Sequence, residues 1–597
     1  MLLYSLLHLS GYDLPLDDIM RFRQWESKAP GHPEYGLTPG VETTTGPLGQ
    51  GCANAVGMAL AERMLAERLN RQDFAPVDHR TFVFCGDGDL MEGISHEAFS
   101  LAGHLGLHKL IVFYDSNRIT IEGSTDLAYS DDVRRRFQAY HWNVLETDAH
   151  DFTRIDRAIR RALREKHRPT LIICHSHIAH GSPNKHDTAA AHGEPLGEEE
   201  VKASKRNLGL DENQFFVVPQ RVRDLFAERS RRLQKIANAW ENHLQRYCDQ
   251  NPDYQRLWNS YFSDSLPPGL EDALPSFATD KPVATRVASG KVLQTLAPRI
   301  PNLVGGAADL APSTKTIMEG AGHVNREAFG GRNLHFGVRE HAMAGILNGM
   351  ALHGGFRVFG ATFFVFLDYC RPSVRLAAMM RLPVIYVFTH DSFYVGEDGP
   401  THQPVEHAAS LRCIPNMTVI RPADASETGI AWLTALRNTH GPTAILLSRQ
   451  DLPVLDRSTL APPALLANGA YTLWQSAPGC PHLILIASGS EVDLALRAAR
   501  QLASTVCVRV VNMPSWELFE RQPLEYRQEV LPPECVARIA IEAGVSQGWE
   551  RYVGPLGAAI CLDRFGASAP YKVLGEKFGF TVEHVVAVAT KVLAATR

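Results

Sequence analysis

The feature that most constrains the fold is a strand–helix–strand pattern in which both strands end in polar residues. An apolar run, Thr81 to Cys85, ends in Gly86-Asp87-Gly88, and a helical stretch separates it from a second apolar run, Leu110 to Tyr114, which leads to Asn117. This order predicts a βαβ unit. Because parallel neighbouring strands end at the same edge of a sheet, Asp87 and Asn117 should converge in the crevice where open α/β sheets bind ligands.

Two interpretations of these polar strand ends stay open. An Asp-Gly pair after a strand is most often a turn signal without any further role. Alternatively, carboxylate and amide oxygens are ligands for Mg²⁺ or Ca²⁺, and these ions often bind phosphate as well. Gly86 and Gly88 would then allow the backbone to approach a diphosphate closely. The second interpretation predicts a metal and diphosphate site at this edge.

The composition predicts a globular protein of several domains. The 597 residues are 45% hydrophobic, which is enough for three or four domains with a core in each. The net charge of −5 gives no basic bias toward nucleic acid or anionic lipid, so we expect neither partner. The longest apolar runs are too short to span a bilayer, and no basic flank marks a signal peptide. Ten scattered cysteines without a Cys-x-x-Cys pair predict reduced side chains in a cytoplasmic protein.

Alternating strand and helix patterns divide the chain into three α/β domains with mainly parallel sheets. The first covers residues 1–265 and includes a charged, solvated helix at 220–247. A Pro-rich linker at 266–283 leads to a second domain at 284–455, and a smaller third domain covers 470–597. Strands are expected at 81–85, 110–114, 143–147, 169–176, 302–306, 383–389, 443–448, 482–487, 506–511 and 536–541.

A group of histidines follows the fourth predicted strand. Its members are His175, His177, His180, His186 and His192. Imidazole is a common zinc ligand, but no cysteine lies nearby and the spacing fits no common zinc site. Individual roles for these histidines are therefore favoured over a shared metal.

Three further clusters in the second domain complete a recognisable pattern. They are Phe336-Gly337-Val338-Arg339-Glu340-His341, then Thr362 to Tyr369, and then Thr389-His390-Asp391 with the motif Gly-Glu-Asp-Gly-Pro-Thr-His-Gln-Pro at 396–404. The Gly-Asp-Gly and Asn117 pair is shared by thiamine diphosphate enzymes, and all the motifs together closely resemble transketolase along the whole chain. The resemblance implies two thiamine diphosphate-binding-type domains and a smaller C-terminal α/β domain.

The resemblance also implies the reaction. A two-carbon ketol unit would pass from a ketose phosphate of the xylulose 5-phosphate type to an aldose phosphate of the ribose 5-phosphate or erythrose 4-phosphate type. The transfer uses a thiamine diphosphate carbanion and belongs to the pentose phosphate pathway. Two other thiamine diphosphate enzymes, 1-deoxyxylulose-5-phosphate synthase and dihydroxyacetone synthase, stay open as alternatives, as does a catalytically impaired homologue. The motif at 396–404, together with Arg286 and Arg449, favours transfer between phosphosugars.

Cofactor-binding residues follow from the same resemblance. Asp87, the Asn117 side chain and the Ile119 carbonyl would hold Mg²⁺ or Ca²⁺ on the cofactor's diphosphate. Glu340 would hydrogen-bond the pyrimidine ring, and burial raises the pKa of a carboxyl, which suits it to share a proton with a ring nitrogen. The other cofactor-binding residues implied are Gly46, Pro47, Leu48, Gly86, Gly88, His192, Phe363, Phe366 and Tyr369, with Phe366 as the stacking ring. Without the resemblance, Glu340 is a surface carboxylate and the aromatic residues are ordinary helix core.

Substrate residues are implied in the same way. They are His192, Arg286, Ser313, His390, Asp398, His402 and Arg449. The arginines suit phosphate because a planar guanidinium binds two oxygens at once. Catalytic roles fall to Glu340 and to His402, His32 and His192, since an imidazole that titrates near neutrality moves protons to and from sugar hydroxyls. Any one of the 25 histidines is otherwise structural or solvated.

The family's assembly implies a homodimer. The domain that binds the diphosphate and the domain that binds the pyrimidine come from different subunits, so each active site lies between two subunits. Asp309, Glu92 and Glu97 lie in segments expected near that interface.

The chain departs from the family's pattern at its beginning. The Ser-Gly-His-Pro-Gly and Asn-Gly-His motifs, whose histidines contact substrate and cofactor, do not occur. Residues 2–9 have the pattern of a buried, uncapped interior helix. We therefore expect either a mistaken start at Met1 or a reduced homologue, and favour the first. Either predicts weak or absent activity and low solubility, which full turnover by the purified 597-residue protein would contradict.

Overall fold

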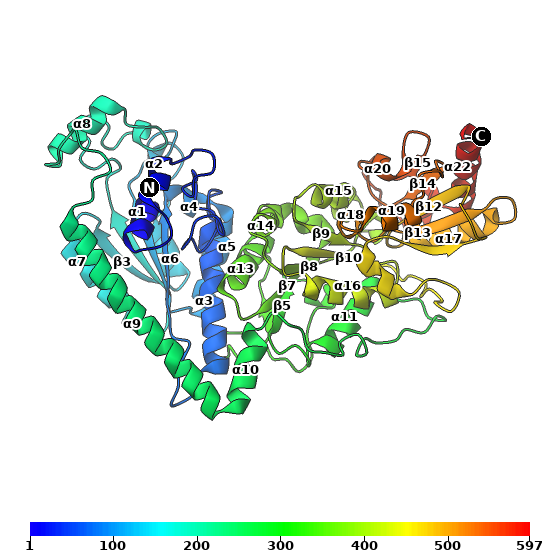
Figure 1. Cartoon of the computed structure of the whole chain (residues 1–597), viewed down its shortest axis with the longest axis horizontal. Coiled ribbons are helices and arrows are strands. Elements are labelled where there is room, and N and C mark those ends of the chain that lie inside the picture. Colours follow the sequence, from blue (N-terminus) through cyan, green and yellow to red (C-terminus); the bar gives the residue numbers. More distant parts are fainter. Residues whose placement is uncertain (597) are drawn as a thin grey trace. The chain divides into compact units, whose positions relative to one another are not determined.

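The computed structural model describes residues 1–596 (Figure 1). They form two compact units. The first unit consists of Met1–Phe262 with Asn325–Gly330 and Gly345–Gly355, and the second consists of Ser263–Val324, Gly331–Ala344 and Phe356–Arg597. The first unit contains one β-sheet and the second contains two. The predicted α/β class with mainly parallel sheets is confirmed.

The sheet of the first unit is parallel throughout. Its strands are β1 (Thr81–Gly86), β2 (Leu110–Ser116), β3 (Asn143–Asp148) and β4 (Thr170–His175), in the order β1-β2-β4-β3. All four strands were predicted from their apolar, β-branched and aromatic runs. Gly86 lies opposite Asp115 in the register of β1 and β2. The predicted βαβ unit is therefore confirmed, and both polar strand ends lie at one edge.

Helices make up most of the rest of the first unit. They are α1 (Leu2–Leu9), α2 (Leu16–Met20), α3 (Gln50–Leu69), α4 (Asp87–Met91), α5 (Gly93–Leu105), α6 (Val133–Ala139), α7 (Phe152–Ala162), α8 (Glu198–Asn207), α9 (Gln220–Gln250) and α10 (Pro252–Phe262). The Ala-rich α3 is almost entirely buried, whereas α9 is exposed along nearly its whole length, as its charge pattern predicted.

The first helix corrects one prediction. Helix α1 forms where it was expected, but only Tyr4 and Leu7 are buried, in a small cluster with Leu14 and Ile19. Leu2, Leu3 and Leu6 are exposed. The expectation of a buried helix was wrong because one packing surface covers only one stripe of a helix, and an all-apolar sequence does not show how many surfaces it meets.

The first sheet of the second unit has six parallel strands. They are β5 (Leu303–Ala307), β6 (Asn333–His335), β7 (Arg357–Phe363), β8 (Val384–Thr389), β9 (Thr418–Ile420) and β10 (Thr443–Leu447), in the order β6-β5-β7-β8-β10-β9. The strands β5, β8 and β10 were predicted, whereas β6, β7 and β9 were not. Helices along this part of the chain are α11 (Thr285–Leu296), α12 (Ala311–Thr314), α13 (Glu340–His353), α14 (Leu367–Met379), α15 (His407–Arg412) and α16 (Ala425–Arg437).

The last sheet is mixed. Its strands are β11 (Tyr471–Gln475), β12 (Leu483–Ala487), β13 (Val508–Asn512), β14 (Arg538–Ile541) and β15 (Ala558–Ile560), in the order β11-β13-β12-β14-β15, and only the β11–β13 pair is antiparallel. The predicted strands at 482–487, 506–511 and 536–541 are confirmed. Its helices are α17 (Glu491–Leu502), α18 (Trp516–Glu520), α19 (Leu524–Val530), α20 (Glu550–Val553), α21 (Tyr571–Lys577) and α22 (Val582–Ala595).

One stretch of the described chain, Tyr571–Ala595, is long and apolar enough to cross a membrane by length and composition. It is not one continuous helix, because α21 and α22 are separated by a turn at Gly579, which has φ +80°. Helix α22 has 14 residues, fewer than the ~20 needed to span a bilayer. Val585 and Ala589 of α22 also pack into the core of the last sheet. Only 22% of its most apolar part is buried, so core packing accounts for a part of this apolar character.

Candidate functional site

The carboxylate of Asp87 lies at the carboxyl edge of the first sheet, where β1 passes into α4. Asp87 is buried, and its Oδ1 accepts a hydrogen bond from the Tyr114 hydroxyl while its Oδ2 accepts one from the Arg118 backbone N–H at 3.2 Å. Burial raises the pKa of Asp87, and these hydrogen bonds only partly offset that effect. A cation bound here would compensate the desolvated carboxylate.

Asn117 and Ile119 lie on the segment that reaches Asp87 through Arg118. Asn117 Oδ1 accepts a hydrogen bond from the Ile119 N–H at 3.0 Å, and its Nδ2 donates to Asp115 Oδ2 at 3.3 Å. These bonds place the Asn117 amide oxygen and the Ile119 backbone next to Arg118, whose N–H binds the buried Asp87 carboxylate. Oxygen donors of these kinds fit Mg²⁺ or Ca²⁺ better than a soft metal. We call this group, Asp87 with Asn117 and Ile119, the Asp87 site.

Asp89 joins two loops beside the Asp87 site. Its Oδ1 accepts a hydrogen bond from the Gly49 N–H and its Oδ2 accepts one from the Gly86 N–H, both at 2.9 Å. Neither the role of Asp89 nor the contact of Tyr114 with Asp87 was predicted from the sequence. Asp89 is the third residue of α4, where an acidic side chain reaches back to the residue before the helix, and this capping position is the signal that could have identified it.

The loop at residues 46–48 lies between His32 and the Gly-Asp-Gly turn. A Cβ added to Gly46, which has φ +137°, would lie 3.4 Å from Cγ of His32. A Cβ on Gly88 would lie 2.9 Å from the Leu48 side chain, whereas one on Gly86 would meet nothing within 4 Å. The backbone at Gly86 is therefore open to a ligand, as the sequence predicted.

The remaining predicted residues of the first unit are exposed. Pro47, Leu48 and His32 lie at the surface, and so does His192, which follows the short 3-10 helix η2 (Ala189–Ala191). Within residues 1–596, no hydrogen bond or ion pair joins the His192 side chain to Asp87. The structure brings His32 to the loop at 46–48 but does not bring His192 into contact with the Asp87 site.

In the second unit, the predicted residues follow the ends of neighbouring strands. Phe363, Thr389 and Leu447 stand in register at the ends of β7, β8 and β10. The residues that come next in the chain therefore emerge at one edge of the sheet. Among them are His390 directly after β8 and Arg449 two residues after β10.

Aromatic rings line this edge. Phe363 lies 3.7 Å from the His390 ring and 5.9 Å from Phe366, centroid to centroid, and Phe366 in turn lies 5.8 Å from Tyr369 and 5.7 Å from His402. Phe366 is half-buried and Tyr369 is exposed. The alternative of an ordinary helix core is therefore wrong for these two rings, which are accessible to a ligand.

Positive charge gathers beside the aromatic rings. Arg286 donates from Nη1 to the Ser313 carbonyl at 2.7 Å, and among the described residues its buried Nε has no hydrogen-bond partner. His390 is buried, and burial, with the charges of Arg286 and Arg449, lowers its pKa to about 3. Two guanidinium groups beside a neutral imidazole suit an anion such as phosphate.

Glu340 is buried, with 8% of its surface exposed, and it is the first residue of α13 after β6. The alternative of a surface carboxylate is therefore wrong. We call Glu340, the aromatic rings and the cationic residues of this edge the Glu340 site.

Asp398 is exposed, as are Glu92 and Asp309. The interface roles of Glu92, Glu97 and Asp309 stay predictions.

Comparison with known proteins shows similarity along the whole chain. Family models match as "Transketolase, thiamine diphosphate binding domain" over residues 1–267, "Transketolase, pyrimidine binding domain" over 281–454 and "Transketolase-like TK C-terminal domain" over 469–581. The transketolase of Geobacillus stearothermophilus is 51% identical over 589 residues, covering 98% of this chain and 88% of that relative.

Solved structures give the same result. The transketolase from Leishmania mexicana has a TM-score of 0.95 and 44% identity, covering 99% of this chain and 87% of the other. A transketolase from Pichia stipitis in complex with sedoheptulose 7-phosphate has a TM-score of 0.95 and 40% identity, covering 99% and 88%.

Proposed function

Because the chain belongs to the transketolase family, we propose that it transfers a two-carbon ketol unit from a ketose phosphate to an aldose phosphate. The donor is of the xylulose 5-phosphate type and the acceptor of the ribose 5-phosphate or erythrose 4-phosphate type, as in the pentose phosphate pathway. The observation that carries this proposal is the cluster of Arg286, Arg449 and His390 beside an accessible aromatic wall. The positive charge of that cluster suits the phosphate of a phosphosugar, whereas a site for uncharged substrates has no need of it.

The Asp87 site would hold the cofactor's metal. Thiamine diphosphate, when bound, supplies a nucleophilic carbon that carries the two-carbon unit. Asp87, Asn117 and the Ile119 carbonyl would bind Mg²⁺ or Ca²⁺ through oxygen, and the open backbone at Gly86 would admit the diphosphate. Asp89 positions this turn by holding the Gly86 and Gly49 N–H groups.

The Glu340 site would hold the organic part of the cofactor and the substrate. Glu340 is buried at the start of α13, where its carboxyl could hold a proton against a ring nitrogen. Phe366 would stack on a planar ring, flanked by Phe363 and Tyr369.

The cationic residues of the Glu340 site would bind the substrate's phosphate. Arg286, Arg449, Ser313 and His390 provide donors for it, and Asp398 would lie further along the channel. Proton transfer at sugar hydroxyls would fall to His402, His32 and His192. The Pichia stipitis relative in complex with sedoheptulose 7-phosphate, a phosphorylated ketose, supports a phosphosugar as the substrate class.

We propose a homodimer with active sites between subunits, located in the cytoplasm. Glu92, Glu97 and Asp309 are the candidate interface residues. All ten cysteines are free, which is consistent with a reducing compartment. Light scattering on the purified protein should give twice the 66.0 kDa of one chain, and a monomer that retains full activity would contradict the shared-site arrangement.

A coupled assay tests the reaction itself. With thiamine diphosphate and Mg²⁺, xylulose 5-phosphate and ribose 5-phosphate should be converted, and omission of the acceptor should stop turnover. Activity only with pyruvate would contradict ketol transfer and favour the synthase alternative.

Asp87→Asn should abolish the stabilisation that thiamine diphosphate and Mg²⁺ give to the folded protein. At 100 times the dissociation constant, a ligand bound only by the folded state stabilises by about 2.7 kcal/mol, so the unmodified protein should show a clear rise in thermal midpoint. Asn keeps the size of Asp but removes the charge that a divalent metal needs. Differential scanning fluorimetry with and without both ligands measures the effect.

Asp126→Asn is the matched control, because Asp126 is an exposed carboxylate on the same segment, in the 3-10 helix η1 (Thr125–Leu127). It should keep the full ligand-induced rise. An undiminished rise in Asp87→Asn would remove Asp87 from the metal site.

A further inference from the structure

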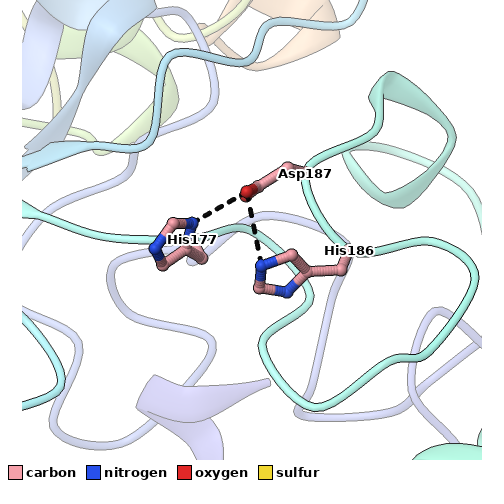
Figure 2. A group of neighbouring side chains, drawn as sticks. All are labelled: His177, His186 and Asp187. Carbon is pink, nitrogen blue, oxygen red and sulfur yellow. Dashed lines mark hydrogen bonds and ion pairs between the residues drawn. The ribbon is translucent and has the colours of Figure 1, made fainter.

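Three side chains with metal-ligating atoms meet on the surface of the first unit between β4 and α8, as Figure 2 shows. Asp187 Oδ2 lies 2.8 Å from Nδ1 of His177 and 3.3 Å from Nε2 of His186. One ligand atom from each of the three residues lies within 4.8 Å of the others. Zinc bonds of about 2.0–2.1 Å in a tetrahedron place neighbouring ligand atoms about 3.3–3.4 Å apart. The 3.3 Å distance matches this spacing, whereas the 2.8 Å distance is that of a hydrogen bond and would lengthen by about 0.5 Å when an ion binds.

The loop that carries these side chains is held in shape at several points. Asp187 donates its N–H to the Ile178 carbonyl at 3.1 Å, so the two ends of the loop are linked directly. Glu200 of α8 accepts hydrogen bonds from the Ser182 hydroxyl and from the backbone and side-chain nitrogens of Asn184, and these bonds lower the pKa of Glu200 to about 2. The ligand atoms are thus brought together by a folded loop rather than by their own contacts alone.

The cluster lies beside a cavity through which a metal ion can reach it, and further histidines lie nearby. His177 and Asp187 line a cavity of about 1100 Å³ at the carboxyl ends of β2, β3 and β4. The cluster itself is partly exposed, so a metal can enter and water can complete its coordination. His150 and His180 stack on one another at 4.1 Å, and His150 Nε2 accepts the His177 N–H at 3.3 Å, but neither ring belongs to the cluster.

We propose that His177, His186 and Asp187 bind one divalent transition-metal ion of the Zn²⁺ and Co²⁺ type. Two imidazoles and one carboxylate prefer such ions to Mg²⁺ or Ca²⁺, which prefer oxygen ligands alone. His177 and Asp187 line the same cavity as Asn117 and Ile119 of the Asp87 site, but none of the three proposed ligands belongs to that site, and the two sites differ in metal preference. The bound ion would cross-link the two ends of the loop, five residues before His192.

Separate roles for these histidines were predicted because their spacing along the sequence fits no common zinc site. Of the five histidines in the sequence group, His177 and His186 belong to the cluster. The third ligand is Asp187, an acidic residue, which a pattern of histidines and cysteines does not include. The competing explanation for the geometry is a carboxylate that is hydrogen-bonded to two imidazoles with no metal bound. A cobalt titration separates these two explanations.

Cobalt titration of the full-length protein tests the proposal. The protein is stripped with a chelator, supplied with excess Mg²⁺ and no thiamine diphosphate, and titrated with Co²⁺. We expect one tight equivalent with visible absorption bands of low-coordinate Co²⁺, which Zn²⁺ should displace. His186→Gln should weaken binding by at least about 100-fold, because loss of a group outside the ligand set already costs about 10–100-fold.

His180→Gln is the matched control, because it removes a neighbouring exposed imidazole outside the cluster. It should bind Co²⁺ like the unmodified protein, and thermal midpoints of both variants verify that the fold is intact. Absence of a stoichiometric equivalent in the unmodified protein, or equal losses in both variants, would overturn the proposal in favour of the metal-free hydrogen-bonded cluster. The titration contains neither cofactor nor sugar, so its failure is distinguishable from a failure of the transketolase assay.

Discussion

Glu340→Gln is expected to lower kcat by about 10²–10⁴-fold, the usual contribution of a positioned acid or base. Glu340 is buried at the first residue of α13, and Gln preserves its size and much of its hydrogen bonding. Gln cannot hold or release the proton that Glu would share with the cofactor ring. Initial rates with xylulose 5-phosphate and ribose 5-phosphate, at saturating thiamine diphosphate and Mg²⁺, measure the loss.

Two further measurements separate a loss of catalysis from a loss of cofactor binding or of folding. The ligand-induced rise in thermal midpoint reports whether Glu340→Gln still binds the cofactor, and that rise should be retained at high ligand concentration. Glu319→Gln, at an exposed glutamate of the same unit, should leave the rate unchanged. Full turnover by Glu340→Gln would show that the proton is held elsewhere.

Arg421→Met is expected to destabilise the second unit by about 3–5 kcal/mol, because it leaves buried carboxylates without their counter-charge. Arg421 follows β9, and its Nε lies 2.7 Å from Asp391 Oδ2, while its Nη1 pairs with Glu491 of α17. The side chains of Arg421, Asp391 and Glu491 are 2%, 2% and 0% exposed. This network therefore links the six-stranded parallel sheet to the last sheet, and its side chains are shielded from water.

The surroundings of Arg421 leave no easy replacement for its charge. The Nη1 group also donates to the Ser488 carbonyl at 3.1 Å, and Nη2 donates to the Ser490 hydroxyl at 3.2 Å. Gly489 has φ +55°, and a Cβ there would lie 2.6 Å from the guanidinium, so the backbone wraps closely around it. Methionine can fill the volume but satisfies none of these acceptors.

Arg437→Met is the matched control, because the Arg437–Glu271 pair is half exposed on both sides. Exposed ion pairs contribute about 0–1 kcal/mol, so this variant should unfold almost like the unmodified protein. Urea-induced unfolding followed by tryptophan fluorescence compares the two, since Trp516 and Trp549 lie in the core of the last sheet. Equal shifts of the transition in both variants would contradict a stabilising role for the buried network.

Much of the fold could be predicted from local pattern. The strands β2, β4, β8 and β12 contain continuous apolar runs, and such runs between turn residues are typical of buried parallel strands. The strands β6 and β9 have three residues each, too few for a pattern. Helix α1 shows another limit, since its apolar sequence did not reveal that three of its five leucines are exposed.

The residues of the candidate site likewise fall into those that the sequence predicted and those that only the structure revealed. Asp87, Asn117 and His390 stand at the ends of predicted strands, a position that can be recognised in the sequence, whereas Phe363 ends β7, a strand that was not predicted. Asp89 and Tyr114, which hold the Asp87 turn in place, were missed because their partners are set by how the turn folds. The contacts of Arg421 with Glu491 and of His177 with Asp187 were missed for the same reason.

The sequence by itself determined the α/β class, ten of the fifteen strands of the described chain and several of the strand ends that carry the functional residues. These properties depend on apolar periodicity and on turn residues, which act over a few neighbouring positions. Only the tertiary structure decided which distant side chains meet, which carboxylates are buried and where histidines gather. Those outcomes depend on how the chain folds back on itself and excludes water, and no short stretch of sequence records that.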